Sequence, residues 1–275
     1  MKRNAVKRSI IFMMLCLFSI FILVPLLWMF STTMRKPVDS FKLPPAIFPE
    51  RLNFDQYRLV FEKVDFLTFV RNSFIIAFSC VLLHVVFSSL SAFAFARLDF
   101  PMKKVLFIVF LSAIMIPGQV MNIPRFLMMV KLKLVDTHLA LILPAFFDAM
   151  GIFLIRQFMM TIPQSYDDAA YIDGANKFQC YLRIIMPMTK PALMVIAVRN
   201  FIGSWNDFYT PLIYINTTSK MTLPLGLTRL RNAAGGDDNQ AVVLAGVVLS
   251  LIAPLVFYII GQRYLVEGIN LGGIK

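Results

Sequence analysis

Long apolar segments flank one polar stretch, Ser165-Tyr-Asp-Asp-Ala-Ala-Tyr-Ile-Asp-Gly-Ala-Asn-Lys-Phe-Gln-Cys-Tyr-Leu-Arg-Ile-Ile-Met-Pro187. Ser165 followed by Asp168 is a weak form of the capping box, which predicts that a helix starts there. Gly174 predicts the end or a bend of that helix, because glycine adopts backbone angles that other residues resist. A second helical run is predicted over 176–186, and Pro187 would close it. The sequence therefore predicts a helix–bend–helix unit that is too polar to lie in lipid.

The first of these helices carries small residues on one face, which a second protein can approach closely. Tyr166 lies on this face, and at offsets of three, four and seven from it the sequence has Ala169, Ala170 and Asp173. A solvated connector between two spans is the alternative interpretation of so polar a segment.

The composition excludes a soluble domain. Of the 275 residues, 59% are hydrophobic and only 15% are charged, and the mean hydropathy is +0.74. Globular chains have roughly 25% charged residues. The net charge of +12 is typical of loops that meet anionic lipid headgroups. No basic patch interleaved with aromatic residues lies outside the apolar segments, so we expect no nucleic-acid partner.

Apolar runs long enough to cross a bilayer recur along the chain, since one helical span needs about 20 residues. They predict an all-α polytopic membrane protein with six transmembrane helices, at 9–30, 71–96, 105–123, 138–155, 191–215 and 241–261. Pro117-Gly118 predicts a break in the third span, which is tolerated where the freed backbone groups find partners or line a cavity.

The segments between the spans complete a single transmembrane domain over 1–275. We expect an outer segment at 31–69, an amphipathic piece in the outer interface at 124–137, an outer loop at 216–240, a core domain over 70–263 and a cytoplasmic tail at 264–275.

Lys and Arg residues are almost evenly divided between the two sides of this topology. The first span is preceded by four of them, which favours a cytoplasmic N-terminus: Lys2, Arg3, Lys7 and Arg8. Six spans then put both termini in the cytoplasm, with the 165–187 stretch on the cytoplasmic face between helices 4 and 5.

The polar stretch resembles the "EAA" loop of ABC-importer permeases. The residues that carry the resemblance are Asp168-Ala-Ala-Tyr-Ile-Asp-Gly-Ala175 and Pro187. Asp168 stands where the family usually has Glu, which keeps the charge and shortens the reach by one methylene. The resemblance implies a cytoplasmic loop that docks on an ATPase through Asp168, Ala169, Ala170, Asp173, Gly174, Ala175 and Pro187.

Four further stretches are similar to the MalG-like, carbohydrate-type branch of these permeases: Gly151-Ile-Phe-Leu-Ile-Arg-Gln-Phe158, Ser204-Trp-Asn-Asp207, Leu223-Pro-Leu-Gly-Leu227 and the C-terminal residues 262–275. That branch implies a bacterial cytoplasmic-membrane heterodimer with a second, homologous permease subunit, two ATPase subunits and an extracytoplasmic solute-binding protein. ATP and Mg²⁺ would bind the ATPase, and this chain would bind no cofactor. The tail would contact the ATPase interface through Glu267, Gly268, Gly272 and Gly273.

The sequence contains no enzyme signature and no Walker phosphate loop, so ATP coupling requires a partner. Cys16, Cys80 and Cys180 are isolated, and no metal site or disulfide is expected.

Ionisable residues inside membrane spans are costly, and such positions are candidate functional sites. The candidates for a solute pathway are Asp148, Asp207, Trp205 and Asn206, because an indole face and hydrogen-bonding groups suit a sugar ring. The alternative is that Trp205 belongs to an interfacial belt and that Asn206 and Asp207 bond to a neighbouring helix.

We therefore predict a permease subunit of an ATP-driven sugar importer that works by alternating access. An ABC permease for another solute, such as a polyamine or glycerol phosphate, is the nearer alternative. A stand-alone secondary carrier is the farther one, and it would need paired half-repeats and an ion site in the membrane, neither of which the sequence contains.

Overall fold

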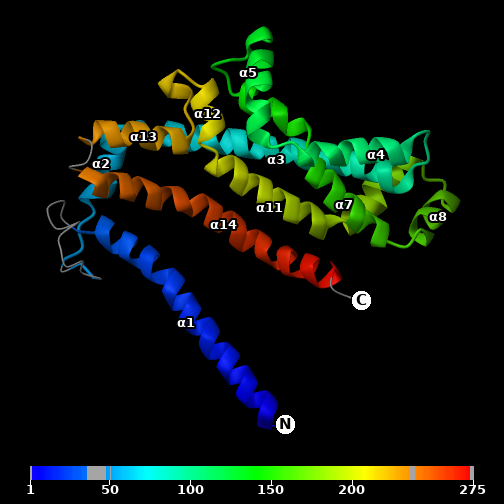
Figure 1. Ribbon diagram of the computed structural model, residues 1–275, viewed down its shortest axis with the longest axis horizontal. Coiled ribbons are helices and arrows are strands. Elements are labelled where there is room, and N and C mark those ends of the chain that lie inside the picture. The colour runs from blue at the N-terminus through cyan, green and yellow to red at the C-terminus, as the bar shows by residue number, and fades with distance from the viewer. Residues whose placement is uncertain (1, 36–47, 50, 236–238, 273–275) are drawn as a thin grey trace. The chain divides into compact units, whose positions relative to one another are not determined.

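The computed structural model describes residues 2–35, 48–49, 51–235 and 239–272, and these residues form helices, turns and bends without any strand (Figure 1). The chain divides into two compact units. The first comprises Met1–Leu67 with Gly226–Ile252, and the second comprises Thr68–Leu225 with Ala253–Lys275. The all-helical fold that the sequence predicts is confirmed for the described residues.

Four helical segments are long and apolar enough to cross a membrane: Lys7–Thr33, Phe66–Arg97, Leu139–Thr161 and Gln240–Arg263. Two bent pairs bring the number to six if each pair is one span. These are Lys103–Met115 with Gly118–Lys131, bent by 95°, and Lys177–Met188 with Lys190–Asn206, bent by 75°. The described residues thus contain four to six candidate spans, and the predicted six is the upper value.

The second unit is built on α3 (Phe66–Arg97), α4 (Lys103–Ser112), α7 (Ala149–Thr161) and α11 (Lys190–Asn206), and α7 packs against both α4 and α11 (Figure 1). Buried apolar side chains from α3, α7 and α11 form a common core. Its members include Phe93 of α3, Met159 of α7 and Ile196 of α11, together with Ala170 of α8 (Ser165–Ile172).

The third predicted span is not one straight helix. After α4 and the 3-10 turn η2 (Ala113–Met115) the chain turns by 95° at Ile116 and Pro117. It continues through η3 (Gly118–Met121) into α5 (Asn122–Lys131). Proline removes a donor and fixes φ, so the break falls where the sequence predicts it. The amphipathic piece, expected at 124–137, is this α5 helix, and it ends at Lys131.

The fourth and fifth predicted spans are also interrupted. The fourth consists of α6 (Leu139–Ile142), η4 (Leu143–Phe146) and α7, and it extends to Thr161 instead of ending at residue 155. The fifth consists of α11 and α12 (Tyr209–Tyr214), separated by two non-helical residues.

The expected outer loop at 216–240 is largely helical, which corrects the prediction. It contains η6 (Thr218–Lys220) and α13 (Leu223–Ala233). The Leu225 and Leu230 side chains are buried, so burial offsets the low helix propensity of the Gly, Thr and Asn residues in this segment. The last span continues without a break into the predicted tail, because α14 runs over Gln240–Gly272.

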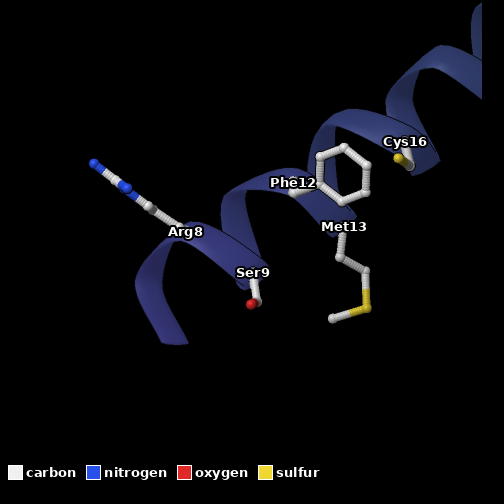
Figure 2. Close-up of a pocket in the computed structure, with 5 residues that line it drawn as sticks. All are labelled: Arg8, Ser9, Phe12, Met13 and Cys16. Atoms are coloured by element: carbon white, nitrogen blue, oxygen red, sulfur yellow. The ribbon is translucent and has the colours of Figure 1, made fainter. Parts of the chain in front are cut away.

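The first unit includes α1 (Lys2–Thr33) and α2 (Asp55–Lys63). The Thr33 hydroxyl lies 2.7 Å from the Tyr57 hydroxyl, which ties the end of α1 to α2. An open depression on α1 is lined by that helix alone (Figure 2), through Arg8, Ser9, Phe12, Met13 and Cys16. A depression with walls from one helix has no converging groups, so it is not a candidate site.

Candidate functional site

The predicted helix–bend–helix unit, residues 165–187, lies at the end of the second unit where α3 ends (Figure 1). We call it the coupling unit. Its first helix, α8 (Ser165–Ile172), begins at the predicted residue, but the N-cap is Gln164 and no side chain caps the helix. The predicted capping role of Ser165 is therefore wrong.

The bend follows from the backbone at Gly174, where φ is +83°. Residues with a Cβ rarely adopt this left-handed conformation. The Gly174 N–H donates to the Tyr171 carbonyl at 3.1 Å, and the Ala175 N–H donates to the Ala170 carbonyl at 2.9 Å. The bend thus satisfies carbonyls that the end of α8 would otherwise leave free.

A capping box, which sequence reasoning missed, starts the second half of the coupling unit. Asn176 Oδ1 accepts from the Gln179 N–H at 2.9 Å, and Gln179 Oε1 accepts from the Asn176 N–H at 2.9 Å. The helix α9 (Lys177–Cys180) follows. An N-cap residue with Gln three positions later is a readable signal in the sequence.

Pro187 does not close the second helical run, contrary to the prediction. A π-helical turn, η5 (Tyr181–Ile185), leads into α10 (Met186–Met188), and Pro187 lies in the first turn of α10. The helical run is continuous from α9 through η5 into α10, and it ends at Met188, one residue after Pro187. The bend of 75° into α11 comes at the next residue, Thr189.

The inner face of the coupling unit is packed into the core of the second unit. Four of its side chains are buried there, namely Ala170, Cys180, Tyr181 and Ile185. The Tyr181 hydroxyl lies 2.7 Å from the Ser89 hydroxyl of α3. Burial raises the pKa of Tyr181, so its phenol stays protonated and available for this hydrogen bond.

A buried ion pair joins the coupling unit to the last residue of α3. Arg97 Nε lies 3.2 Å from Asp167 Oδ2, and the two side chains are 9% and 4% exposed. Arg97 Nη2 also donates to the Ile162 carbonyl at 2.7 Å. The Cys180 thiol donates to Asp167 Oδ1 at 3.5 Å. Burial, with the Asp167 carboxylate second, raises the pKa of Cys180, which keeps the thiol protonated as a donor.

The outer face of the coupling unit is exposed and partly apolar. The large exposed side chains are Tyr166 at 48%, Tyr171 at 40%, Ile172 at 87%, Phe178 at 60% and Leu182 at 44%. Four predicted docking residues share this exposure: Asp168, Ala169, Asp173 and Gly174. Pro187 is exposed and Ala175 is half-buried.

Ala170 is the exception among the predicted docking residues. Its side chain is only 3% exposed and packs into the core. The expected single face with Tyr166, Ala169 and Asp173 is therefore wrong for this residue, because Ala170 lies on the inner side of α8.

The predicted solute-pathway residues at the end of α11 have different environments. Trp205 is 2% exposed; its ring contacts Phe74 edge-on at a centroid distance of 4.8 Å and stacks on Phe201 at 5.7 Å. Asn206 is exposed. Asp207 Oδ1 accepts from the Thr210 N–H at 3.1 Å, at the start of α12. In this conformation the indole is enclosed by neighbouring aromatic rings.

Asp148, the fourth predicted solute-pathway residue, precedes the first residue of α7 and faces α11. Its Oδ2 atom lies 3.8 Å from Arg199 Nη1, and the two side chains are 11% and 52% exposed. Asp148 and Arg199 therefore serve as counter-ions for each other. Whether either group contacts a solute stays a prediction.

The predicted tail residues Glu267, Gly268 and Gly272 lie in the helical backbone of α14, and Gly273 lies outside the described residues. Among the residues that the structure describes, no three His, Cys, Asp or Glu side chains form a group that could hold a metal ion.

Comparison with known proteins identifies relatives over nearly the whole chain. Residues 2–269 match the family described as binding-protein-dependent transport system inner membrane component. The arabinooligosaccharides transport system permease protein AraQ of Halalkalibacterium halodurans is 33% identical over 228 residues, covering 82% of this chain and 81% of the relative. The trehalose transport system permease protein SugB of Mycobacterium tuberculosis is 31% identical over 255 residues, covering 92% of each chain.

A solved structure has the same fold. It is a chain of a bacterial ABC transporter involved in the import of the acidic polysaccharide alginate. The TM-score is 0.83 at 22% sequence identity, and the match covers 96% of this chain and 98% of the other.

Proposed function

Because the chain belongs to the family of binding-protein-dependent transport system inner membrane components, we propose that it is the permease subunit of an ABC importer for a sugar or oligosaccharide. The family match confirms the resemblance that the 165–187 stretch predicts. The protein is a multi-pass component of the cytoplasmic membrane and a transport subunit rather than an enzyme.

The solute class is supported by the relatives. Those with the coverage given above are named for arabinooligosaccharides and for trehalose. No feature of the described residues favours a polyamine or glycerol phosphate. A stand-alone carrier receives no support from a family that is defined by dependence on a binding protein.

The observation that carries the proposed coupling role is the two-sided construction of the coupling unit. Its inner face is held in the core by burial and by the Arg97–Asp167 pair. Its outer face exposes aromatic and aliphatic side chains beside the carboxylate of Asp168. Large exposed apolar side chains next to a charged group are typical of a protein interface. The docking partner that we propose is a cytoplasmic ATPase.

The proposed assembly has one copy of this chain, a second homologous permease, two ATPase subunits that bind ATP and Mg²⁺, and an extracytoplasmic solute-binding protein. Both termini lie in the cytoplasm, and the α14 tail approaches the ATPases. ATP binding draws the ATPases together, the coupling unit follows as a rigid body, and access switches from the inner to the outer side. Hydrolysis resets the assembly.

Substitution of Gly174 tests the proposal. In membrane vesicles with the complete importer, Gly174→Asp should leave the chain inserted but reduce sugar uptake at least tenfold, because the bend at φ +83° is strained by a Cβ and the docking face gains a charge. No neighbouring atom lies within 4 Å of the added Cβ, so strain and charge are the only local effects.

Gly235→Asp is the matched control. Gly235 has a φ of +98° and also has no atom within 4 Å of an added Cβ, but it lies outside the coupling unit. Its variant should keep uptake within about twofold of the unmodified chain. Normal uptake by Gly174→Asp, or failure of any ATPase to co-purify with the unmodified chain in mild detergent, would contradict the proposed coupling role.

A further inference from the structure

We propose that Arg97 and Asp167 form a positioning pair that passes the movement of the coupling unit to helix α3. This inference rests on the proposed function, because it concerns how a docked ATPase moves the membrane helices. Asp167 faces inward and does not contact the ATPase in this scheme, so it acts through the helices that it holds.

The pair stands where three segments of the chain converge. Arg97 is the last residue of α3, Asp167 lies in the first turn of α8, and Ile162 follows the end of α7. The Arg97 guanidinium contacts both of the other segments. Its Nε atom lies 3.2 Å from Asp167 Oδ2, and its Nη2 atom donates to the Ile162 carbonyl at 2.7 Å. The contact with Ile162 is a hydrogen bond, whereas the contact with Asp167 is an ion pair in which neither Arg97 Nε nor Asp167 Oδ2 makes a hydrogen bond, so charge attraction holds the two side chains together.

The carboxylate of Asp167 is held from two sides. Its Oδ2 atom faces Arg97, and its Oδ1 atom accepts from the Cys180 thiol at 3.5 Å. Cys180 belongs to α9, beyond the bend at Gly174. Both halves of the coupling unit are therefore connected to the end of α3 through one buried carboxylate.

Apolar packing alone would connect these segments less rigidly. The other inner-face side chains, such as Ala170 and Ile185, make non-directional contacts that tolerate small sliding movements. A buried ion pair does not tolerate separation, because an unpaired charge in a poorly solvated site is costly. When α8 moves, the end of α3 has to follow or the pair has to break.

Two adjacent carboxylates in α8 would thus have separate tasks. Asp168 is exposed and available to a partner, whereas Asp167 is 3% exposed and directed at α3. In this scheme the ATPase moves α8 through its contact with Asp168, and Asp167 passes the movement of α8 to α3.

The experiment compares solute transported per ATP hydrolysed in proteoliposomes that contain the complete importer, with maltose and trehalose as the first sugars tried and ATPase recovery measured in parallel. Asp167→Asn and Arg97→Lys should retain the ATPase and keep hydrolysis within about twofold. Transport per ATP should fall about fivefold to tenfold, which is in the usual range for the loss of one coupling interaction. A purely structural role would lower the amount of assembled importer and leave this ratio unchanged.

A double variant tests whether the single variants act by leaving one buried charge without a partner or by releasing the contact between α8 and α3. Arg97→Met with Asp167→Leu removes both charges, and such replacements of a buried pair are usually neutral or favourable for stability. The double variant should assemble normally and still show the reduced ratio, since apolar side chains can slide past each other without the cost of separating two buried opposite charges. Recovery of the unmodified ratio by the double variant would overturn the proposal. If either single variant fails to fold, the double variant still allows the solute transported per ATP to be measured.

Arg58→Gln is the control for loss of an arginine. Arg58 pairs with Glu62 on the exposed surface of α2 at 2.6 Å, and its removal should change neither assembly nor the ratio. The two proposals fail separately. Absence of an ATPase from the unmodified complex contradicts the proposed function, whereas a recovered ATPase with an unchanged ratio in every Arg97 and Asp167 variant contradicts the positioning pair alone.

Discussion

Gly261 allows α14 to approach α11 more closely than any other residue would. A Cβ at this position would lie 2.3 Å from Val198 Cγ2, well inside van der Waals contact. Small residues at helix–helix contacts are the usual means of close packing in membranes, where no hydrophobic force drives helices together. The identity of this one residue therefore sets the separation of two helices in the second unit.

We expect Gly261→Ala to destabilise the chain by about 1–3 kcal/mol, the usual cost of overpacking. Val198→Ala in the same chain should restore most of the loss, because it removes the methyl groups that meet the new Cβ. The measurement is the thermal unfolding midpoint in detergent. Gly203→Ala is the control, since no atom lies within 4 Å of a Cβ there. An unchanged midpoint for Gly261→Ala would show that the helices separate at no cost.

Asp136 is a second residue with a local task, on the connection between α5 and α6. Its backbone has a φ of +60°, and its carboxylate accepts from Asn216 N–H, Thr217 N–H and the Thr217 hydroxyl at 2.6–2.9 Å. The Lys220 ammonium lies 3.1 Å from Oδ2. The hydrogen bonds from Thr217, with smaller contributions from Asn216 and Lys220, hold the pKa of Asp136 far below its ordinary value.

A depressed pKa means that the Asp136 carboxylate stabilises the fold above its unfolded pKa of about 4, and that this contribution is lost as the pH falls through the folded pKa. The unfolding midpoint of the unmodified chain should exceed that of Asp136→Asn by a constant amount between about pH 5 and 8. The difference should shrink below about pH 4. A difference that stays constant down to about pH 2 would contradict this linkage.

At the scale of elements, the break predicted at Pro117-Gly118 is confirmed, whereas the weak capping box predicted at Ser165 is absent. Pro117 breaks its span as predicted, because proline acts on its own backbone wherever it lies. The helical run that contains Pro187 ends one residue later than predicted, at Met188. The start of α8 at Ser165 is right, although the capping interaction expected there is absent and a stronger one occurs at Asn176.

Tertiary contacts explain what the sequence pattern leaves unpredicted. The coupling unit is visible as a motif, but nothing local distinguishes Asp167 from Asp168. Their difference arises because Arg97, far away in the chain, lies on the inner side of α8. Similarly, the indole face of Trp205 suggests a solute contact in the sequence, and only the fold reveals that Phe74 and Phe201 lie against this ring.

For the whole molecule, apolar composition predicts membrane residence but does not distinguish continuous spans from broken ones. Three of the six predicted spans are interrupted in the structure, those at 105–123, 138–155 and 191–215. Composition shows how many apolar residues a span contains. Whether the helix is continuous depends on where its backbone groups find hydrogen-bond partners outside the helix. The two compact units were not predicted, because their boundaries fall inside α3, α13 and α14, where the sequence has no linker.

The exposure of α1 has a consequence for the synthesis of the protein. Lys7–Thr33 has the highest hydropathy of the four candidate spans that are not bent pairs, and none of its most apolar window is buried. A helix whose most apolar window is not buried by the rest of the chain can enter the bilayer as soon as it leaves the ribosome, before the charged coupling unit has been translated. A fusion of residues 1–35 to a soluble reporter should remain in carbonate-washed membranes. The same reporter fused to residues 190–206 should not, because α11 buries seven of its side chains against the rest of the chain. The order of the helices along the sequence is then also an order of events in time, with α1 committing each newly made chain to the membrane.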